Sequence, residues 1–356
     1  MEQFWIDLIE SVSNARGASG FEDEVVEILC PVAAKYGKVY EDRMRNLYCE
    51  RNGNREGLPV VQLDAHTDEV SFMVQAVRPD GTLRFLQLGG WVKAAVAGQR
   101  VQVRNVHGEY IPGVTATVPP HYRKAGEQET LDTDQMSIDV GAGSREEAIR
   151  DFHIRIGEPV VPDVRFTFDR AHDLMIGKAF DCRLGCAALA RTLAEVDGEK
   201  LDVNVTGAWA SQEEVGTRGA AVTANAVKPD VAIVFEGCPA DDTVAEPYMV
   251  LTAIRKGPML RFMDKRMITH PRFQRFALDL GKRLNIPVQA GVRSGGSTNG
   301  APIHLSNLGV PCIVIGIPVR YIHTPYGMAA YSDFESAGRL AAAVLRELNE
   351  QVIAGF

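Results

Sequence analysis

The chain lacks a long apolar run, a basic cluster and a dense set of cysteines, and each absence argues against one class of protein. No apolar run approaches the ~20 residues that a membrane span needs, so no membrane partner is expected. The formal charge is -8 and no segment concentrates Lys and Arg, which argues against nucleic acid as a partner. Six scattered cysteines are too few for a disulfide scaffold of 356 residues and are expected to be reduced thiols.

The first residues, MEQFWIDLIESVSNARG, lack the basic segment, the apolar segment and the cleavage site of a secretory signal. A cytoplasmic protein is therefore expected. The hydrophobic share of 46% and the charged share of 24% are ordinary globular values, without internal repeats or low-complexity tracts. A chain of 356 residues suits one large domain with a smaller one.

Apolar periodicity predicts the fold class. Helical spacing covers the opening residues to about 13 and again residues 21–37. From residue 177 onward helical and strand patterns alternate, and the last helix is expected from residue 333 to about 353. Such alternation predicts an α/β fold with a mixed, mostly parallel sheet sandwiched by helices.

Residues 71–176 have a different sequence pattern, in which short runs of alternating apolar and polar residues are interrupted by Gly, Pro and Asp. Closely spaced strands with turn signals predict a small all-β, barrel-like domain. We therefore expect a main α/β domain formed by residues 1–70 and 177–356, which is split by the inserted β domain of residues 71–176.

Acidic residues and histidines follow several of the predicted strands. The carboxyl ends of strands in open α/β sheets are where ligands bind. Taken singly, each residue has a plain alternative: a charge at a helix N-terminus, an N-cap, a solvated turn or a polar strand end. Their joint placement at successive strand ends favours a site, whose candidates are His66, Asp68, Asp181, Glu213, Glu214, Glu236 and His323.

This set of side chains is typical of a metal centre. Imidazole and carboxylate ligands without thiolates suit Zn²⁺, Co²⁺ or Mn²⁺. One carboxylate that bridges two ions, with one His and one further carboxylate for each ion, uses five residues. A carboxylate is then left to act as a general base, as in two-metal hydrolases such as aminopeptidases.

The order of five motifs resembles that of the M42 metallopeptidases, which are cobalt- or zinc-dependent aminopeptidases related to glutamyl aminopeptidase and to the tetrahedral aminopeptidase particles. The resemblance covers nearly the whole chain, and LQLGGW with GVTATVPPH is similar to the inserted β domain of that family. The five motifs are HTDE, GKAFDCRLG, SQEEVGTRGA, VFEG and RYIHTP.

The resemblance implies a role for each candidate. Glu213 would be the general acid/base, and Asp68 would orient a ligand histidine without contacting metal. The implied ligands are His66, Asp181 and Glu236 for one ion and Asp181, Glu214 and His323 for the other.

The resemblance also implies the reaction and the partners. N-terminal amino acids would be hydrolysed from peptides by a water that bridges two divalent ions per subunit, Zn²⁺ or Co²⁺, with Mn²⁺ as a further candidate. Members of the family assemble through the β insertion, so a homo-oligomer is expected, with a dimer as building block and a dodecamer as a further candidate.

Several positions depart from the family pattern or admit two interpretations. Glu236 stands where many relatives have Asp, and Cys182 stands where many have a second Asp; we expect Cys182 to be a structural thiol. Gly295 and Gly296 either contact substrate or form a tight turn. Arg261 either lines the specificity pocket or is an exposed strand residue.

Two other functions fit the same motifs. A related dinuclear amidohydrolase would remove acyl groups from amino acids with the same site and a different pocket. A metal-binding scaffold without catalysis is a further alternative, although such a protein has no need of Glu213.

Overall fold

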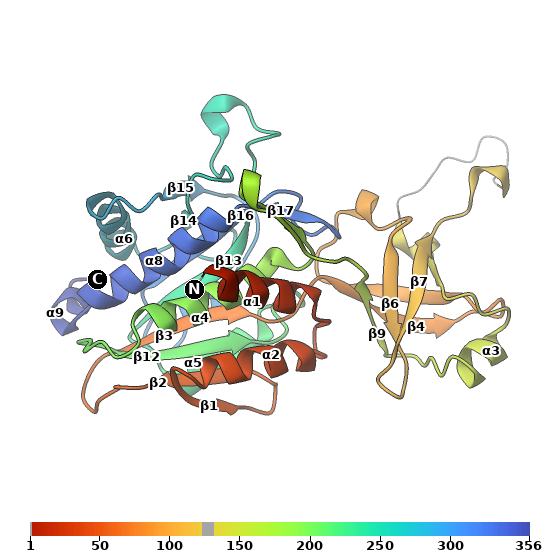
Figure 1. Ribbon diagram of the computed structural model, residues 1–356, viewed down its shortest axis with the longest axis horizontal. Helices are drawn as coiled ribbons and strands as arrows, with labels where there is room; N and C mark the ends of the chain where they lie inside the picture. The colour runs from red at the N-terminus through yellow and green to blue at the C-terminus, as the bar shows by residue number, and fades with distance from the viewer. Residues whose placement is uncertain (1, 123–131) are drawn as a thin grey trace.

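The computed structural model describes residues 2–122 and 132–356. A large sheet with its helices forms one body, and a small barrel of strands lies beside it (Figure 1). The predicted class, a mixed sheet sandwiched by helices with an inserted β barrel, is confirmed. No helix in the described ranges has both the length and the apolar character needed to cross a membrane.

The large sheet has eight strands, and its central pairs β12–β3, β3–β13 and β13–β16 are parallel. Strands β1, β2 and β14 join it with antiparallel pairings. The central strands are buried on both faces, which explains their continuous apolar sequences. In spatial order the strands are β1 (Gly37–Glu41), β2 (Leu47–Arg51), β12 (Asn204–Ala210), β3 (Val60–His66), β13 (Val231–Pro239), β16 (Cys312–Val319), β14 (Met259–Met263) and β15 (Gln289–Val292).

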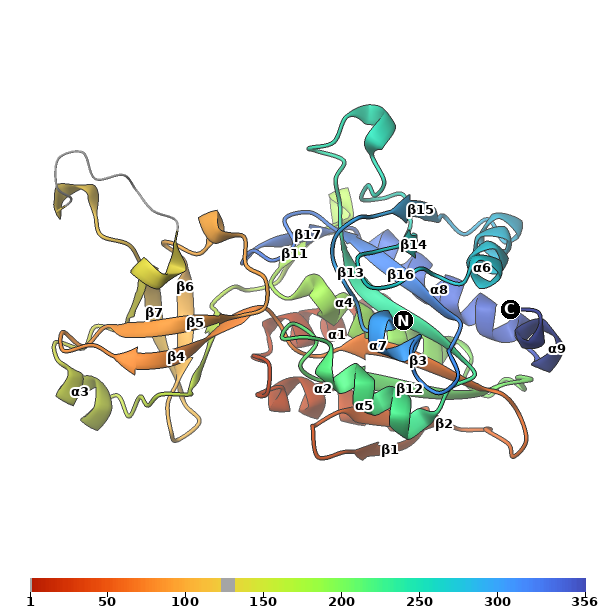
Figure 2. The same ribbon diagram turned by 180° about the vertical axis from the view of Figure 1, so that it is seen from behind.

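Helices cover both faces of this sheet. The main core lies between one face of the sheet and the five helices that cover it. These helices are α1 (Glu2–Asn14), α2 (Asp23–Ala33), α4 (Phe180–Glu195), α6 (Pro271–Arg283) and α8 (Tyr331–Glu347). On the opposite face, seen in Figure 2, α5 (Arg218–Val227) and α7 (Gly300–Ile303) pack over a smaller apolar cluster.

The single final helix predicted for residues 333–353 is wrong, because the structure has two helices there. Helix α8 ends at Glu347, and Leu348 is extended. Asn349 then begins α9 (Glu350–Ala354), since its side chain accepts a hydrogen bond from the Val352 N–H at 3.0 Å. An Asn in this position is a favourable N-cap, and it begins a second, separate helix.

The barrel closes on itself around its own core, in which Phe72 stacks on Trp91 with ring centroids 4.7 Å apart. Helix α3 (Arg145–Arg150) lies at its edge. In spatial order its strands are β4 (Ser71–Val77), β5 (Leu83–Leu88), β8 (Ser137–Asp139), β7 (Tyr110–Ala116), β6 (Arg100–Arg104) and β9 (Pro159–Pro162).

A third sheet of three strands joins segments from different parts of the chain: β10 (Thr167–Asp169), β11 (Leu174–Gly177) and β17 (Gly327–Ala329). Because β11 leads into α4 and β17 follows the loop after β16, this sheet fixes both loops that border the carboxyl ends of the central strands. The remaining short elements are 3-10 turns at Lys93–Ala95, Pro120–Tyr122, Thr133–Gln135, Arg170–His172 and Pro247–Met249.

Candidate active site

The seven candidate side chains gather at the carboxyl ends of the central parallel strands. His66 is the last residue of β3 and pairs in register with Ala210, the last residue of β12. The loop after β12 carries Glu213 and Glu214, β13 carries Glu236, and the loop after β16 carries His323. Asp181 enters from the first turn of α4. The parallel arrangement predicted from the sequence is what brings these distant segments to one edge.

Asp181 lies between the two histidines and presents one oxygen to each. Its Oδ1 is 3.4 Å from His66 Nε2, and its Oδ2 is 3.3 Å from His323 Nε2. The same His66 nitrogen lies 3.6 Å from Glu236 Oε1, and the same His323 nitrogen lies 3.7 Å from Glu214 Oε1. Two groups of three side chains therefore share Asp181.

The donor atoms of these groups are not satisfied within the protein. His66 Nε2, Glu214 Oε1 and Glu236 Oε2 are buried and have no hydrogen-bond partner among the described residues. Burial raises the pKa of Glu214 to about 8 and that of Glu236 to about 7, because removal from water disfavours the charged form of each carboxyl group. Buried polar atoms without partners point to an absent group, and these nitrogen and oxygen donors fit divalent Zn, Co or Mn.

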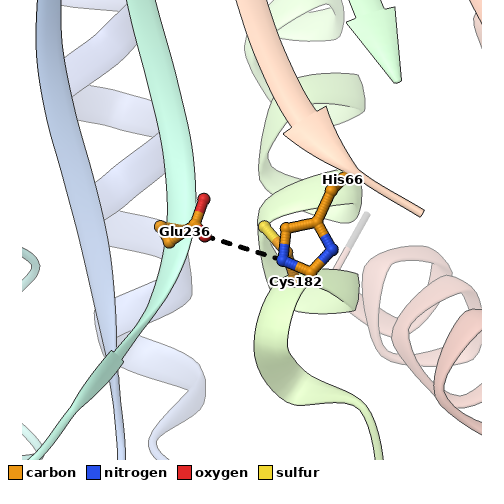
Figure 3. Close-up of side chains that lie close together, drawn as sticks. All are labelled: His66, Cys182 and Glu236. Carbon is orange, nitrogen blue, oxygen red and sulfur yellow. Dashed lines mark ion pairs between the residues drawn. The ribbon is translucent and has the colours of Figure 1, made fainter. Parts of the chain in front are cut away.

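Cys182 lies beside the first of these groups. Its sulfur, an imidazole nitrogen of His66 and a carboxylate oxygen of Glu236 lie within 4.8 Å of one another (Figure 3). The buried thiol donates a hydrogen bond to the Phe235 carbonyl, with Sγ 3.2 Å from the oxygen. The thiol therefore has a partner in the fold, as a structural thiol would, and its sulfur lies close to donor atoms of His66 and Glu236.

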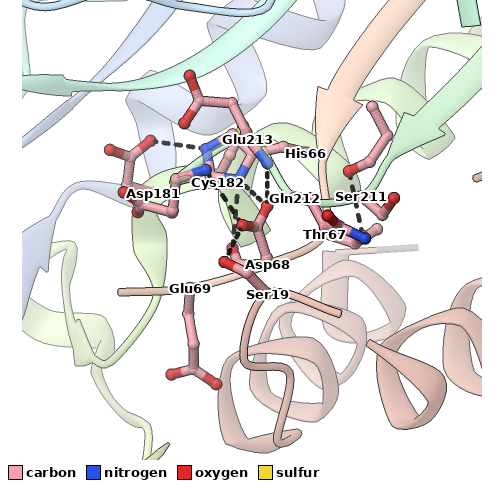
Figure 4. Close-up of polar contacts among 12 residues, drawn as sticks. Ser19, His66, Thr67, Asp68, Glu69, Asp181, Cys182, Ser211, Gln212 and Glu213 are labelled. Carbon is pink, nitrogen blue, oxygen red and sulfur yellow. Dashed lines mark hydrogen bonds and ion pairs between the residues drawn. The ribbon is translucent and has the colours of Figure 1, made fainter. Parts of the chain in front are cut away.

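Asp68 connects His66 to the loop that carries the two glutamates (Figure 4). Its Oδ1 lies 3.2 Å from His66 Nδ1, the ring nitrogen that faces away from Asp181. The same oxygen accepts the Glu213 N–H at 2.8 Å, and Oδ2 accepts the Glu214 N–H at 3.1 Å. One buried carboxylate thus orients an imidazole and fixes the backbone of both glutamates.

The surroundings of Glu213 suggest a different role from that of Glu214. Its side chain lines the cavity of about 450 Å³ that opens on Asp181, Glu236 and His323. Burial raises the pKa of Glu213 well above its ordinary range, and the charges of Glu236 and Glu214 add to this effect. A carboxyl group with a raised pKa at the wall of a cleft is a candidate acid/base.

The same cavity is also lined by Gly295, Gly296 and Arg261. Gly296 has a φ of +77°, and a side chain there would face the Arg261 guanidinium. Arg261 is only 3% exposed, so the interpretation of this residue as an exposed strand arginine is wrong. Its Nη1 lies 3.2 Å from Asp264 Oδ2, while its Nε has no partner among the described residues.

The barrel also contributes to this site, through two glycines whose contacts the motif pattern did not reveal. His323 Nδ1 lies 2.6 Å from the Gly90 carbonyl, and the His323 carbonyl accepts the Val92 N–H at 3.1 Å. Gly89 has a φ of +86°, and a Cβ at this position would lie 2.8 Å from Glu214 Oε2. The double glycine of LQLGGW was the available signal, because only glycine permits so close an approach of backbone to side chain.

A second cavity of similar volume, about 460 Å³, lies between the N-terminal helices and the barrel. Arg16, Glu24 and Gln102 are among its lining residues. None of its described lining residues is a histidine, and Arg16 and Glu24 already pair at 2.6 Å. Candidate site residues therefore line the cavity beside Asp181 and not this one.

Comparison with known proteins agrees with this geometry. The model of the M42 glutamyl aminopeptidase family matches residues 45–340. The chain is 31% identical to the glutamyl aminopeptidase of Lactococcus lactis subsp. cremoris (strain MG1363), with 99% of each chain covered. It is also 31% identical to the putative aminopeptidase FrvX of Escherichia coli (strain K12), over 99% of this chain and 98% of that one.

A solved structure gives the same result. The TET aminopeptidase from the marine sediment archaeon Thaumarchaeota archaeon SCGC AB-539-E09 superposes with a TM-score of 0.95, at 35% identity and with 99% of each chain covered. The family match spans most of the chain, including every candidate site residue. The chain therefore belongs to the M42 glutamyl aminopeptidase family.

Proposed function

We propose that this aminopeptidase hydrolyses N-terminal residues from peptides with two divalent metal ions, Zn²⁺ or Co²⁺, and with Glu213 as general acid/base. The observation that carries the proposal is the position of Asp181, whose two oxygens each face one histidine at 3.3–3.4 Å. The unpartnered nitrogen of His66 and the unpartnered oxygens of Glu214 and Glu236 support it.

The side chains divide between the two ions as their contacts suggest. His66, Asp181 and Glu236 would hold one ion, and Asp181, Glu214 and His323 the other. Bound ions of this kind polarise the scissile carbonyl and lower the pKa of water from ~15.7 toward about 7. Asp68 would keep His66 in the orientation that directs Nε2 at the ion.

Glu213 would move the proton. Its backbone is fixed by Asp68, and its carboxyl group lines the cavity next to Asp181. It would accept the proton of the attacking water and deliver it to the departing amine as the peptide bond breaks. The raised pKa of Glu213 suits this transfer, because a carboxyl group with a raised pKa is a stronger base toward the proton of the water than an ordinary carboxylate.

The pocket favours an acidic N-terminal residue. Arg261 is a buried cation in the wall of the cavity, and its Nε is unpartnered. Gly295 and Gly296, beside it, would leave room for the substrate side chain. The relative from Lactococcus lactis is named glutamyl aminopeptidase, whereas one from Pyrococcus furiosus, 29% identical, is named lysyl aminopeptidase; a buried arginine favours the first preference.

A panel of aminoacyl p-nitroanilides, assayed after chelation and reloading with Zn²⁺, Co²⁺ or Mn²⁺, tests these proposals. Chelation should reduce hydrolysis to background, reloading should restore it, and glutamyl or aspartyl substrates should be preferred. The Arg261→Met variant should lose at least ~10-fold in kcat/KM on acidic substrates, because a hydrogen bond to a charged group contributes ~1.5–3 kcal/mol.

The same variant should change little on alanyl p-nitroanilide, which serves as its matched control. Hydrolysis that survives complete metal removal would contradict the metal proposal. Cleavage of N-acyl amino acids in place of the p-nitroanilides would identify the alternative, a related amidohydrolase.

We also propose that copies of the chain associate through the barrel. Such an association would cover apolar side chains of the barrel that are exposed in the single chain, among them Leu86, Val106, Val114 and Ile156. Light scattering should give a mass of at least two chains, and Leu86→Glu should reduce the assembly. A wild-type monomer would contradict this proposal.

A further inference from the structure

Three consecutive backbone amides in the loop that carries Glu213 donate to two buried carboxylates. The Gln212 N–H donates to Glu22 Oε1 at 3.0 Å, and the next two amides donate to Asp68 at 2.8 and 3.1 Å. Figure 4 shows Asp68 beneath Gln212 and Glu213, with Ser19 on its other side. Ser19 Oγ donates to Asp68 Oδ2 at 2.6 Å. The turn that contains Ser19 and Glu22, just before α2, therefore holds the loop directly and through Asp68.

The amide held by Glu22 belongs to a residue in an unfavourable conformation. Gln212 has a φ of 54°, in the left-handed region that residues other than glycine rarely adopt. On one side of Gln212 the Ser211 N–H donates to Asn46 Oδ1 at 2.8 Å, and on the other side Glu213 lines the cavity. The direction of the Glu213 side chain therefore depends on what keeps Gln212 in this conformation.

Helix capping does not account for Glu22. It stands at the N-cap position of α2, but its side chain makes no capping hydrogen bond to that helix. Its Oε1 accepts the Gly20 N–H at 2.9 Å as well as the Gln212 N–H, and the residue is only 1% exposed. Its Oε2 has no partner in the described part of the chain. Burial of the Glu22 carboxyl group close to that of Asp68 costs free energy. Capping of α2 does not explain why a glutamate is buried there.

We infer that Glu22 is a positioning residue that sets the direction of Glu213 by holding the Gln212 amide, an inference that rests on the proposed role of Glu213. Loss of this hydrogen bond would let the left-handed turn relax. The Glu213 carboxyl group would then leave the position from which it transfers a proton. The metal side chains would remain in place, because Asp68 still holds the Glu214 amide.

Three variants of the metal-loaded enzyme test the inference. Glu22→Ala should lower kcat at least ~10-fold with KM within about twofold, since a misplacement of 1 Å can cost ~10²-fold in rate. Glu22→Gln should retain most of the wild-type kcat, because its amide oxygen can accept the same N–H. Val26→Ala, a buried site on α2, the helix that follows Glu22, is the matched control and should lower Tm without lowering kcat. All three should bind two ions per chain by elemental analysis.

A Glu22→Ala enzyme with wild-type kcat, or a Glu22→Gln enzyme as slow as Glu22→Ala, overturns the inference and leaves the proposed function standing. A wild-type protein that hydrolyses no aminoacyl substrate overturns the proposed function instead. Hydrogen–deuterium exchange then tests the positioning without activity: residues 211–216 should exchange faster in Glu22→Ala and not in Val26→Ala. Equal exchange in the two variants overturns the inference as well.

Discussion

Replacement of Glu213 by Gln should reduce turnover by at least ~10²-fold, because general acid–base catalysis typically contributes 10²–10⁴-fold. The amide can neither accept the proton of the attacking water nor return one to the leaving amine. Its shape is close to that of the carboxyl group, and the backbone of residue 213 remains bonded to Asp68. Steady-state kinetics on a glutamyl p-nitroanilide would measure the loss.

Metal analysis decides how this loss is interpreted. Glu213→Gln should keep both ions, because no ion pair joins Glu213 to His66 or His323 among the described residues, whereas Glu214 Oε1 lies 3.7 Å from His323 Nε2. Glu214→Gln is the matched control and should lose affinity for one ion. A Glu213→Gln enzyme that stays fully active, or that loses metal as Glu214→Gln does, would reverse the division of tasks between the two neighbours.

The fold could be predicted because its signals are local. The continuous apolar runs at Val60–His66 and Cys312–Val319 became buried central strands, and the runs broken by Gly and Pro became the barrel. The clustering of candidate side chains followed from one rule, since parallel strands place their carboxyl ends at one edge. The break between the last two helices could not be predicted, because it depends on the N-cap at Asn349, which apolar periodicity does not reveal.

The contacts that hold the site residues in place could not be predicted, because each of them joins residues far apart in the sequence. The contact of Gly90 with His323 spans 233 residues, and that of Glu22 with Gln212 spans 190. The motifs do not show which residues meet, since one partner is a backbone group in both cases, although the double glycine of LQLGGW indicated a close approach of the backbone. The burial of Arg261 likewise depends on Asp264 and on the loop at Gly296, which only the folded chain brings together.

A buried ion pair lies where the N-terminal helices, the end of β3 and α4 meet. Lys178 Nζ is 2.6 and 2.8 Å from the two Glu69 oxygens and 2.7 Å from the Ala15 carbonyl oxygen. Glu69 also accepts the Gly17 N–H at 3.1 Å, and both side chains are at most 3% exposed. The pair therefore connects the segment after His66 to the segment before Asp181.

Replacement of Lys178 by Met should destabilise the metal-free protein by about 3–5 kcal/mol, because it removes the main partner of the buried Glu69 charge. The metal-free form is used because bound ions would add their own stabilisation to the folded state. Urea unfolding, followed by circular dichroism, should show a midpoint well below that of the wild type.

The double variant Glu69→Gln/Lys178→Met separates the lost attraction from the cost of the unpaired charge. Arg183 Nη2 lies 3.5 Å from Glu69 and partly compensates it, so the effect of Lys178→Met should fall toward the lower end of the range. Neutral Gln removes the buried charge while its amide oxygen can still accept the Gly17 N–H, so the double variant should recover part of the loss. If Lys178→Met unfolds at the wild-type urea concentration, Arg183 alone compensates Glu69 and the pair does not stabilise this junction; if the double variant is less stable than Lys178→Met, the lost hydrogen bonds outweigh the charge.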